Sequence, residues 1–254
     1  MQSQSVDAGR AVSWYGFGWR TFMAKPGIWV VMMLLIAVMM LILQIIPLVG
    51  PLVLSLIFPA LTGGLMYGAK QAAEGRPVEI AHLFMPLTDE HSRVPMLILG
   101  AILLGLSILL SIAAVIVVGG SVGVSIFGGN GGEMSDTAVA VGAMGIGMAL
   151  MFLIALVFGL VTFAALAFAV PLVLFDGIAP VAAVKSSINA SLKNVVPLAV
   201  FLIVYFVLAV IAAMPFFLGF LVLAPVTSAA LYAGYRDIFK ADTAAAEVIP
   251  AQGG

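Results

Sequence analysis

The polar side chains whose spacing most resembles a reactive site are two histidines on either side of two carboxylates. His82 and His91 flank Asp89 and Glu90, and imidazole with carboxylate is a ligand set that transition metals accept. The nine-residue spacing of the histidines matches none of the common metal motifs. We therefore expect a solvated or interfacial loop at this position rather than a metal centre.

The sulfur-containing residues are fourteen methionines, with no cysteine. Without cysteine the chain has no thiol nucleophile, no disulfide and no sulfur-based zinc site. Methionine thioethers are soft ligands for copper, but no cysteine or nearby histidine accompanies them, which favours packing and lipid contact. We therefore predict that the protein binds no metal and no cofactor.

The long apolar segments carry no charged side chain, and their polar residues are one amide and several hydroxyl groups. These are Gln44, Ser55, Thr62, Ser107, Ser111, Thr162, Thr227 and Ser228. Hydroxyl groups in membrane helices usually bond the preceding turn or a neighbouring helix, whereas proton relays and ion pathways place ionisable residues there. Since the pattern offers no acid, base, nucleophile or metal cluster, it predicts that the protein is not an enzyme.

The composition explains why so few reactive groups are present. Of 254 residues, 64% are hydrophobic and 8% are charged, with a mean hydropathy of +1.27. A soluble domain carries about 25% charged residues, so the composition indicates a polytopic helical membrane protein. The net charge of -1 gives no basic field for nucleic acid, which we exclude as a partner.

Four charge-free windows define the expected membrane spans, each of which needs about 20 apolar residues. The windows 26–69 and 194–235 are broken at Pro47 and Pro215, and proline interrupts helices, so each window predicts a hairpin of two spans.

The two middle windows each predict one span. The first runs from Pro95 to Val118 and precedes a glycine-rich loop over 119–140. The second has its core at 147–168, and the pattern leaves open whether 139–175 is one long helix or a helix plus an interfacial segment.

The basic residues determine the expected orientation. With six spans, all ten lie on the same side as both termini: Arg10, Arg20, Lys25, Lys70, Arg76, Arg93, Lys185, Lys193, Arg236 and Lys240. By the positive-inside rule this side is cytoplasmic. We therefore expect a multi-pass protein of the bacterial inner membrane with the 119–140 loop outside.

The two hairpins resemble each other, which predicts an internal repeat. Leu65–Lys70 aligns with Leu231–Arg236, and Pro59 aligns with Pro225. Further upstream, Asp7, Val12, Tyr15, Trp19 and Met23 align with Asp176, Val181, Val184, Ile188 and Leu192. Both units begin on the same side of the membrane, so the repeat is parallel, with its pseudo-twofold axis along the membrane normal.

This repeat gives the expected domain organisation. Residues 1–240 form a single all-α membrane domain, a bundle of six transmembrane helices with two interfacial amphipathic helices. The domain consists of repeat unit one (8–70), a middle hairpin (77–175) and repeat unit two (176–239), followed by a disordered tail over 241–254.

Each unit begins with the amphipathic helix, expected over about 8–25 and from Pro180 onward. The second has an apolar stripe beside polar residues, Val181, Val184, Ile188, Leu192 and Val195 against Lys185, Asn189, Lys193 and Asn194. Such helices lie on the leaflet, although they could instead pack under the bundle and set the angle of the next span. The candidate lipid or partner contacts are Trp14, Trp19, Arg20, Lys25, Trp29, Lys185 and Lys193.

Pairs of small residues four positions apart predict close approach of helices, within the bundle or between subunits. The pairs are Gly64 with Gly68, Ala101 with Gly105, Ala155 with Gly159 and Ala230 with Gly234. Of these we take Gly64, Gly68, Ala230 and Gly234, which lie in the two hairpins, as the candidate packing site.

Short motifs carry a resemblance to a known family. They are Lys25–Gly27, Ile46–Gly50, Gly75–Phe84 and Leu231–Phe239. With these the chain resembles an uncharacterised family of six-span integral membrane proteins from proteobacteria, and it is more distantly similar to the membrane domain attached to some glycerophosphodiester phosphodiesterases. The resemblance implies the six-span fold; it supplies no functional residues and no phosphodiesterase activity.

Two functional hypotheses follow. In the first, the protein is a non-catalytic accessory, scaffold or assembly factor that binds membrane partners or lipid. In the second, it is a transporter or channel for a small or amphiphilic solute. The expected partners are the lipid bilayer and a membrane protein, or a second copy of the chain.

Overall fold

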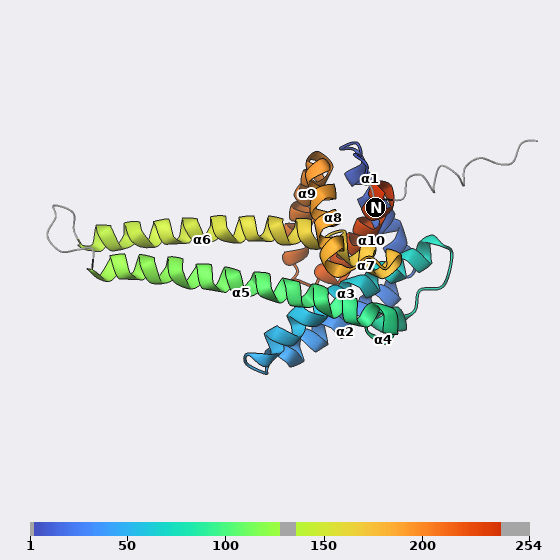
Figure 1. Ribbon diagram of the computed structural model, residues 1–254, viewed down its shortest axis with the longest axis horizontal. Helices are drawn as coiled ribbons and strands as arrows, with labels where there is room; N and C mark the ends of the chain where they lie inside the picture. The colour runs from blue at the N-terminus through green and yellow to red at the C-terminus, as the bar shows by residue number, and fades with distance from the viewer. Residues whose placement is uncertain (1–2, 128–135, 240–254) are drawn as a thin grey trace, which may run out of the picture. The chain divides into compact units, whose positions relative to one another are not determined.

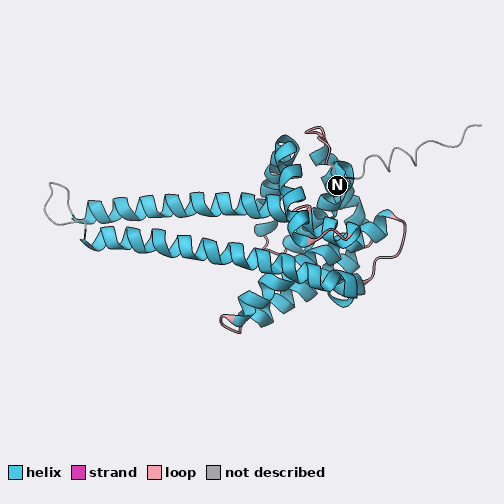
Figure 2. Cartoon of the chain, viewed as in Figure 1, coloured by secondary structure: helices cyan, strands magenta, loops and turns pink. Residues whose placement is uncertain are grey.

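The structure is a computed structural model that describes residues 3–127 and 136–239, and within these ranges all secondary structure is helical (Figure 2). The predicted tail over 241–254 lies outside the described residues. The elements are α1 (Arg10–Ala24), α2 (Pro26–Gln44), α3 (Val49–Ala73), the 3-10 helix η1 (Ile80–Phe84), α4 (Met85–Thr88), α5 (Glu90–Phe127), α6 (Asp136–Leu166), α7 (Ala169–Asp176), α8 (Pro180–Lys193), α9 (Val195–Ala213) and α10 (Phe220–Phe239).

Five of the described helical segments are long and apolar enough to cross a membrane. They are α2, α3, α5, α6 continuing into α7, and α9. The predicted sixth span, α10, is not among them, because Thr227, Ser228 and the polar end at Arg236–Asp237 fall within its 20 residues. This helix is largely buried against other helices, and a helix covered by protein needs less apolar surface than one covered by lipid.

The two hairpin turns form where the proline clusters predict them. α2 ends at Gln44 and α3 begins at Val49, while α9 ends at Ala213 and α10 begins at Phe220. Both turns have a positive φ at non-glycine residues, Leu48 in the first and Phe216 and Phe217 in the second. Each also brings a glycine, Gly50 or Gly219, against the backbone of the preceding helix, where a side chain would overlap it.

The first spans of the two predicted repeat units have matching bounds, but their second spans differ in length, 25 residues for α3 and 20 for α10, and the units pack differently. α2 and α9 are both 19 residues long, and they begin at Pro26 and Val195, with the spacing that relates Asp7 to Asp176. Their preceding helices contact different neighbours: α1 packs mainly on α10, whereas α8 packs mainly on α7.

The expected glycine-rich loop over 119–140 is too long. α5 continues as a helix to Phe127 and α6 begins at Asp136, so the prediction is wrong for both flanks. Glycine weakens helices in water, but a segment in an apolar medium must satisfy its own backbone hydrogen bonds, and membrane helices therefore tolerate glycine. At the other end, helix α6 stops at Leu166 and α7 follows, so the segment 139–175 is not one uninterrupted helix.

The described chain forms two compact units. The first contains residues up to Ala101 and from Ala164 onward, and in it α10 contacts α1, α2, α3 and α9. The second, Ile102–Phe163, contains most of α5 and α6 (Figure 1). Within it the two helices approach closely, since a β-carbon on Gly147 would lie 2.7 Å from the Ser121 side chain.

Candidate functional site

Helix α1 is held to the rest of the first unit by an aromatic face. Ala11, Trp14, Tyr15 and Phe22 are buried, and the Tyr15 ring stacks on Phe201 of α9 at a centroid distance of 4.7 Å. The Tyr15 hydroxyl donates to the Phe201 carbonyl at 3.3 Å. Burial raises the pKa of this hydroxyl above its ordinary value.

Gly18 allows α1 to touch α10 backbone to backbone. A β-carbon at this position would overlap the carbonyl oxygen of Val226 and lie 3.3 Å from the amide nitrogen of Ala230. Gly16, two residues earlier in the helix, is not in such a contact: a β-carbon there would have only the end of the Arg20 side chain within 4 Å. The contact therefore depends on a single small residue on the inner face of α1.

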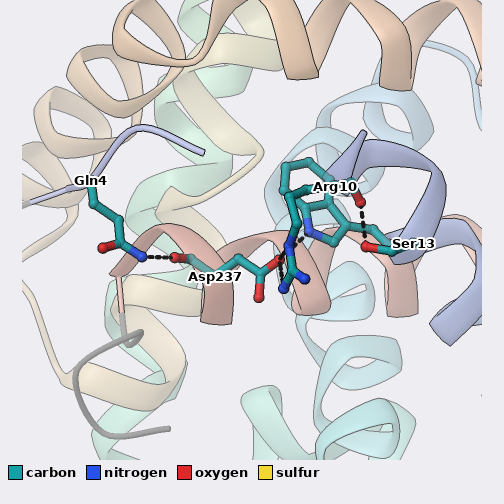
Figure 3. Close-up of polar contacts among 5 residues, drawn as sticks. Gln4, Arg10, Ser13 and Asp237 are labelled. Atoms are coloured by element: carbon teal, nitrogen blue, oxygen red, sulfur yellow. Dashed lines mark hydrogen bonds and ion pairs between the residues drawn. The ribbon is translucent and has the colours of Figure 1, made fainter. Parts of the chain in front are cut away.

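A polar cluster fastens the start of α1 to the end of α10 (Figure 3). The Asp237 carboxylate accepts hydrogen bonds from Arg10 Nε at 2.8 Å and Trp14 Nε1 at 2.6 Å, and it pairs with Arg10 Nη2 at 2.6 Å. Gln4 Nε2 donates to the Asp237 carbonyl at 2.5 Å. Asp237 thus satisfies the indole of Trp14, whose ring is 1% exposed.

The bend between α8 and α9 is held by Asn194. Its side-chain nitrogen Nδ2 donates to the carbonyls of Ala190 at 2.9 Å and Gln4 at 3.0 Å, and its side-chain oxygen accepts from the Val6 amide at 2.8 Å. Asn194 is buried. These bonds fix the angle at which α8 leaves the axis of the α9 span.

Helix α8 packs by a face of small residues. Ala183, Ser187 and Ala190 are fully buried. The Ser187 hydroxyl donates to the Ala164 carbonyl at 2.7 Å and accepts from the Phe168 amide at 3.1 Å. Because α6 ends at Leu166, these bonds satisfy backbone groups that the break between α6 and α7 releases.

The apolar stripe predicted on α8 is a different face from the one that packs. Val181 and Leu192 are 58% and 67% exposed, and Val184 and Ile188 are half-buried; we call these four residues the α8 stripe. On α1 three of the four aligned residues, Val12, Trp19 and Met23, here called the α1 stripe, are 60%, 51% and 53% exposed, whereas the fourth, Tyr15, is buried against Phe201. Both helices therefore pack by one face and leave a second apolar face uncovered within the described chain.

The predicted lipid or partner contacts separate into two groups. Trp19, Arg20, Lys25, Lys185 and Lys193 are exposed. Trp14 and Trp29 are each 1% exposed, and Trp29 donates through Nε1 to the Thr21 carbonyl at 3.2 Å. These two rings fill the interior instead of meeting lipid, so the contact surface excludes them.

The predicted packing residues lie in close contacts, but few of these join two spans. Gly64 meets the backbone of Leu83 in η1, Gly68 faces the Trp29 ring, and Gly234 faces the Trp14 ring. Ala230 is fully buried near Gly18. By contrast, Gly105 and Gly159 have open space around them, and the pattern missed Gly100, where α5 touches the Leu56 backbone of α3.

A second polar cluster was not anticipated from the sequence. Tyr235 donates its hydroxyl to Asp176 Oδ2 at 2.5 Å, and Lys70 Nζ lies 5.0 Å from the centre of the Phe175 ring. The contacts join the ends of α3, α7 and α10. The alignment of Lys70 with Arg236 and of Asp176 with Asp7 marks these positions in the sequence, but alignment alone gives no partners.

The segment with the two histidines forms short helices and caps. His82 Nδ1 accepts from the Glu79 amide at 3.1 Å at the start of η1. Asp89 accepts from the Ser92 amide at 2.9 Å, and these hydrogen bonds from Ser92 lower the pKa of the Asp89 carboxyl. Among the described residues there is no cluster of histidine and carboxylate side chains that could hold a metal ion.

In comparisons with known proteins, no family model, curated protein or solved structure matches the chain. The class of the protein therefore comes from its own features. Over residues 3–127 and 136–239 its secondary structure is all helical, with five segments apolar enough to cross a membrane, the arrangement of a multi-pass membrane protein.

Proposed function

We propose that the chain is a non-catalytic accessory or scaffold protein of the bacterial inner membrane, which acts through a surface formed by α1 and α8. The observation that carries the proposal is the pair of exposed stripes. Each helix is fixed to the protein by a separate face, and each presents apolar residues beside exposed cations, Arg20 on α1 and Lys185 and Lys193 on α8. Amphipathic helices with basic borders are typical of membrane-surface contacts.

The proposal includes six spans, with α10 as the sixth, and a parallel repeat. Support comes from the matching bounds of α2 and α9 and from the two proline turns. Six spans place every basic residue on the side of both termini, which the positive-inside rule makes cytoplasmic. The motif resemblance to the uncharacterised six-span proteobacterial family favours the same arrangement.

The proposal is tested by neutralising the surface cations together. We expect R20Q/K185Q/K193Q to insert normally and to lose most of the membrane protein and lipid that co-purify with the wild type, measured by quantitative mass spectrometry after mild solubilisation. The matched control is R76Q/R93Q/R236Q, which removes the same charge at three other exposed residues and is expected to retain those partners.

The alternative transporter function gives the opposite result. If the triple variant keeps its co-purifying protein and lipid, and reconstituted vesicles show saturable flux of a solute, the surface proposal is wrong and a transporter takes its place.

A further inference from the structure

Helix α8 presents three distinct faces to its surroundings. Successive residues are 100° apart on a helix, which places the buried face of Ala183, Ser187 and Ala190 beside the α8 stripe. The polar face with Lys185, Asn189 and Lys193 follows on the far side of the stripe. Lys185 borders the stripe directly, four residues after Val181.

The position of α8 along the chain brings the stripe to the membrane. Helix α9 begins at Val195, with a single residue between it and the end of α8, and it is among the most apolar of the candidate spans. Val195 and Val196 are themselves more than half exposed. Leu192 therefore lies three residues before the exposed start of this candidate span, and the Asn194 bonds hold the junction between α8 and α9.

The lysines beside the α8 stripe and the similar exposed residues on α1 indicate which kind of molecule covers the stripe. Lysine buries its methylene stem along apolar surface while its ammonium reaches the headgroups, and each basic residue near an anionic leaflet strengthens attachment about fivefold. Lys193 Nζ donates to the Ser3 carbonyl at 3.4 Å, which uses one of its three donors. On α1, a helix with different packing, three of the four aligned positions (the α1 stripe) are likewise uncovered, beside the exposed Arg20.

We propose that α8 is a binding surface for anionic phospholipid: the α8 stripe lies among the acyl chains next to the glycerol level, and Lys185 and Lys193 bind the headgroup phosphates. The inference rests on the proposed function and names the chemistry of one of its partners. The bound class is a diacyl phospholipid with net negative charge, such as phosphatidylglycerol.

The absence of cysteine from the sequence makes a direct test possible. The full chain with L192C carries one environment-sensitive fluorophore and is reconstituted in phosphatidylcholine vesicles with 30 mol% phosphatidylglycerol. Quenching is compared for spin-labelled phosphatidylglycerol and spin-labelled phosphatidylcholine at equal amounts. V181C is a second probe on the same face, and N189C is the matched control on the polar face.

We expect both stripe probes to be quenched, with phosphatidylglycerol two- to fivefold more effective than phosphatidylcholine. The N189C probe stays solvent-exposed and weakly quenched. In a K185Q/K193Q background, quenching persists and the preference between the two lipids falls to one.

Two results would overturn the inference: stripe probes as weakly quenched as N189C, or equal quenching by the two lipids in the wild-type background. The vesicles contain no other protein, so either result concerns lipid alone. Failure of the proposed function is measured separately, by the co-purifying membrane proteins of the triple charge variant.

Discussion

Replacing Gly64 with alanine is expected to lower the thermal midpoint of the purified protein by about 5–10 °C. At this position α3 and η1 touch through their backbones, and a β-carbon would overlap the Leu83 carbonyl oxygen and lie 2.6 Å from its carbon. Backbone cannot move aside as a side-chain end can, so the added methyl group separates the two elements. Tryptophan fluorescence during heating in detergent measures the change.

The adjacent residue supplies the matched control. Gly63 is in the same helix, but a β-carbon there meets only side chains, with Leu174 and Val170 at 3.4 Å. Alanine also favours the helix over glycine by about 1 kcal/mol, so we expect G63A to remain within about 3 °C of the wild type. Equal losses for the two variants would show that the contact between Gly64 and Leu83 is not a tight one.

The second large effect is expected at Asp237. An alanine there removes the acceptor of Trp14 Nε1, whose side chain is buried and whose hydrogen bond is partly shielded from solvent. A hydrogen bond to a charged group contributes about 1.5–3 kcal/mol, so D237A should lower the thermal midpoint by about 4–8 °C.

Arg10 binds the same carboxylate, so replacing Arg10 separates the contribution of the ion pair from that of the Trp14 hydrogen bond. Its side chain is 53% exposed, and exposed ion pairs contribute at most about 1 kcal/mol. We therefore expect R10Q to shift the midpoint by less than half as much as D237A, and W14F to resemble D237A. If R10Q and D237A are equally damaging, the ion pair, and not the buried indole, fastens α1 to α10.

The sequence was sufficient for the helical class, for the hairpin turns at Pro47 and Pro215, and for five of the six predicted spans, because these follow from composition and proline geometry alone. It was insufficient for the packing face of α8. An amphipathic pattern locates the apolar side of a helix, but Ala183, Ser187 and Ala190 form a tighter contact than the larger residues of the stripe, and small residues give no hydrophobic signal.

Contacts that a local pattern does not show also explain the wrong predictions for glycine and tryptophan residues. Glycine was interpreted as a loop former at 119–127, where the structure has helix, and Gly100 was overlooked although it lies against α3. Tryptophan is a residue type typical of interfacial anchors. Trp14 and Trp29 instead donate hydrogen bonds within the protein, Trp14 to the Asp237 carboxylate and Trp29 to the Thr21 carbonyl. Local spacing in the sequence does not show which acceptor a buried side chain will meet.

The proposed surface requires that α1, α8 and all ten basic residues lie on the cytoplasmic side of a six-span bundle. Fusions of alkaline phosphatase, which is active only outside the cytoplasm, test this most directly. We expect the fusion at Asn130 to be active and the fusion after Lys240 to be inactive. An inactive fusion at Asn130 together with an active one after Lys240 would contradict the orientation and, with it, the proposed surface.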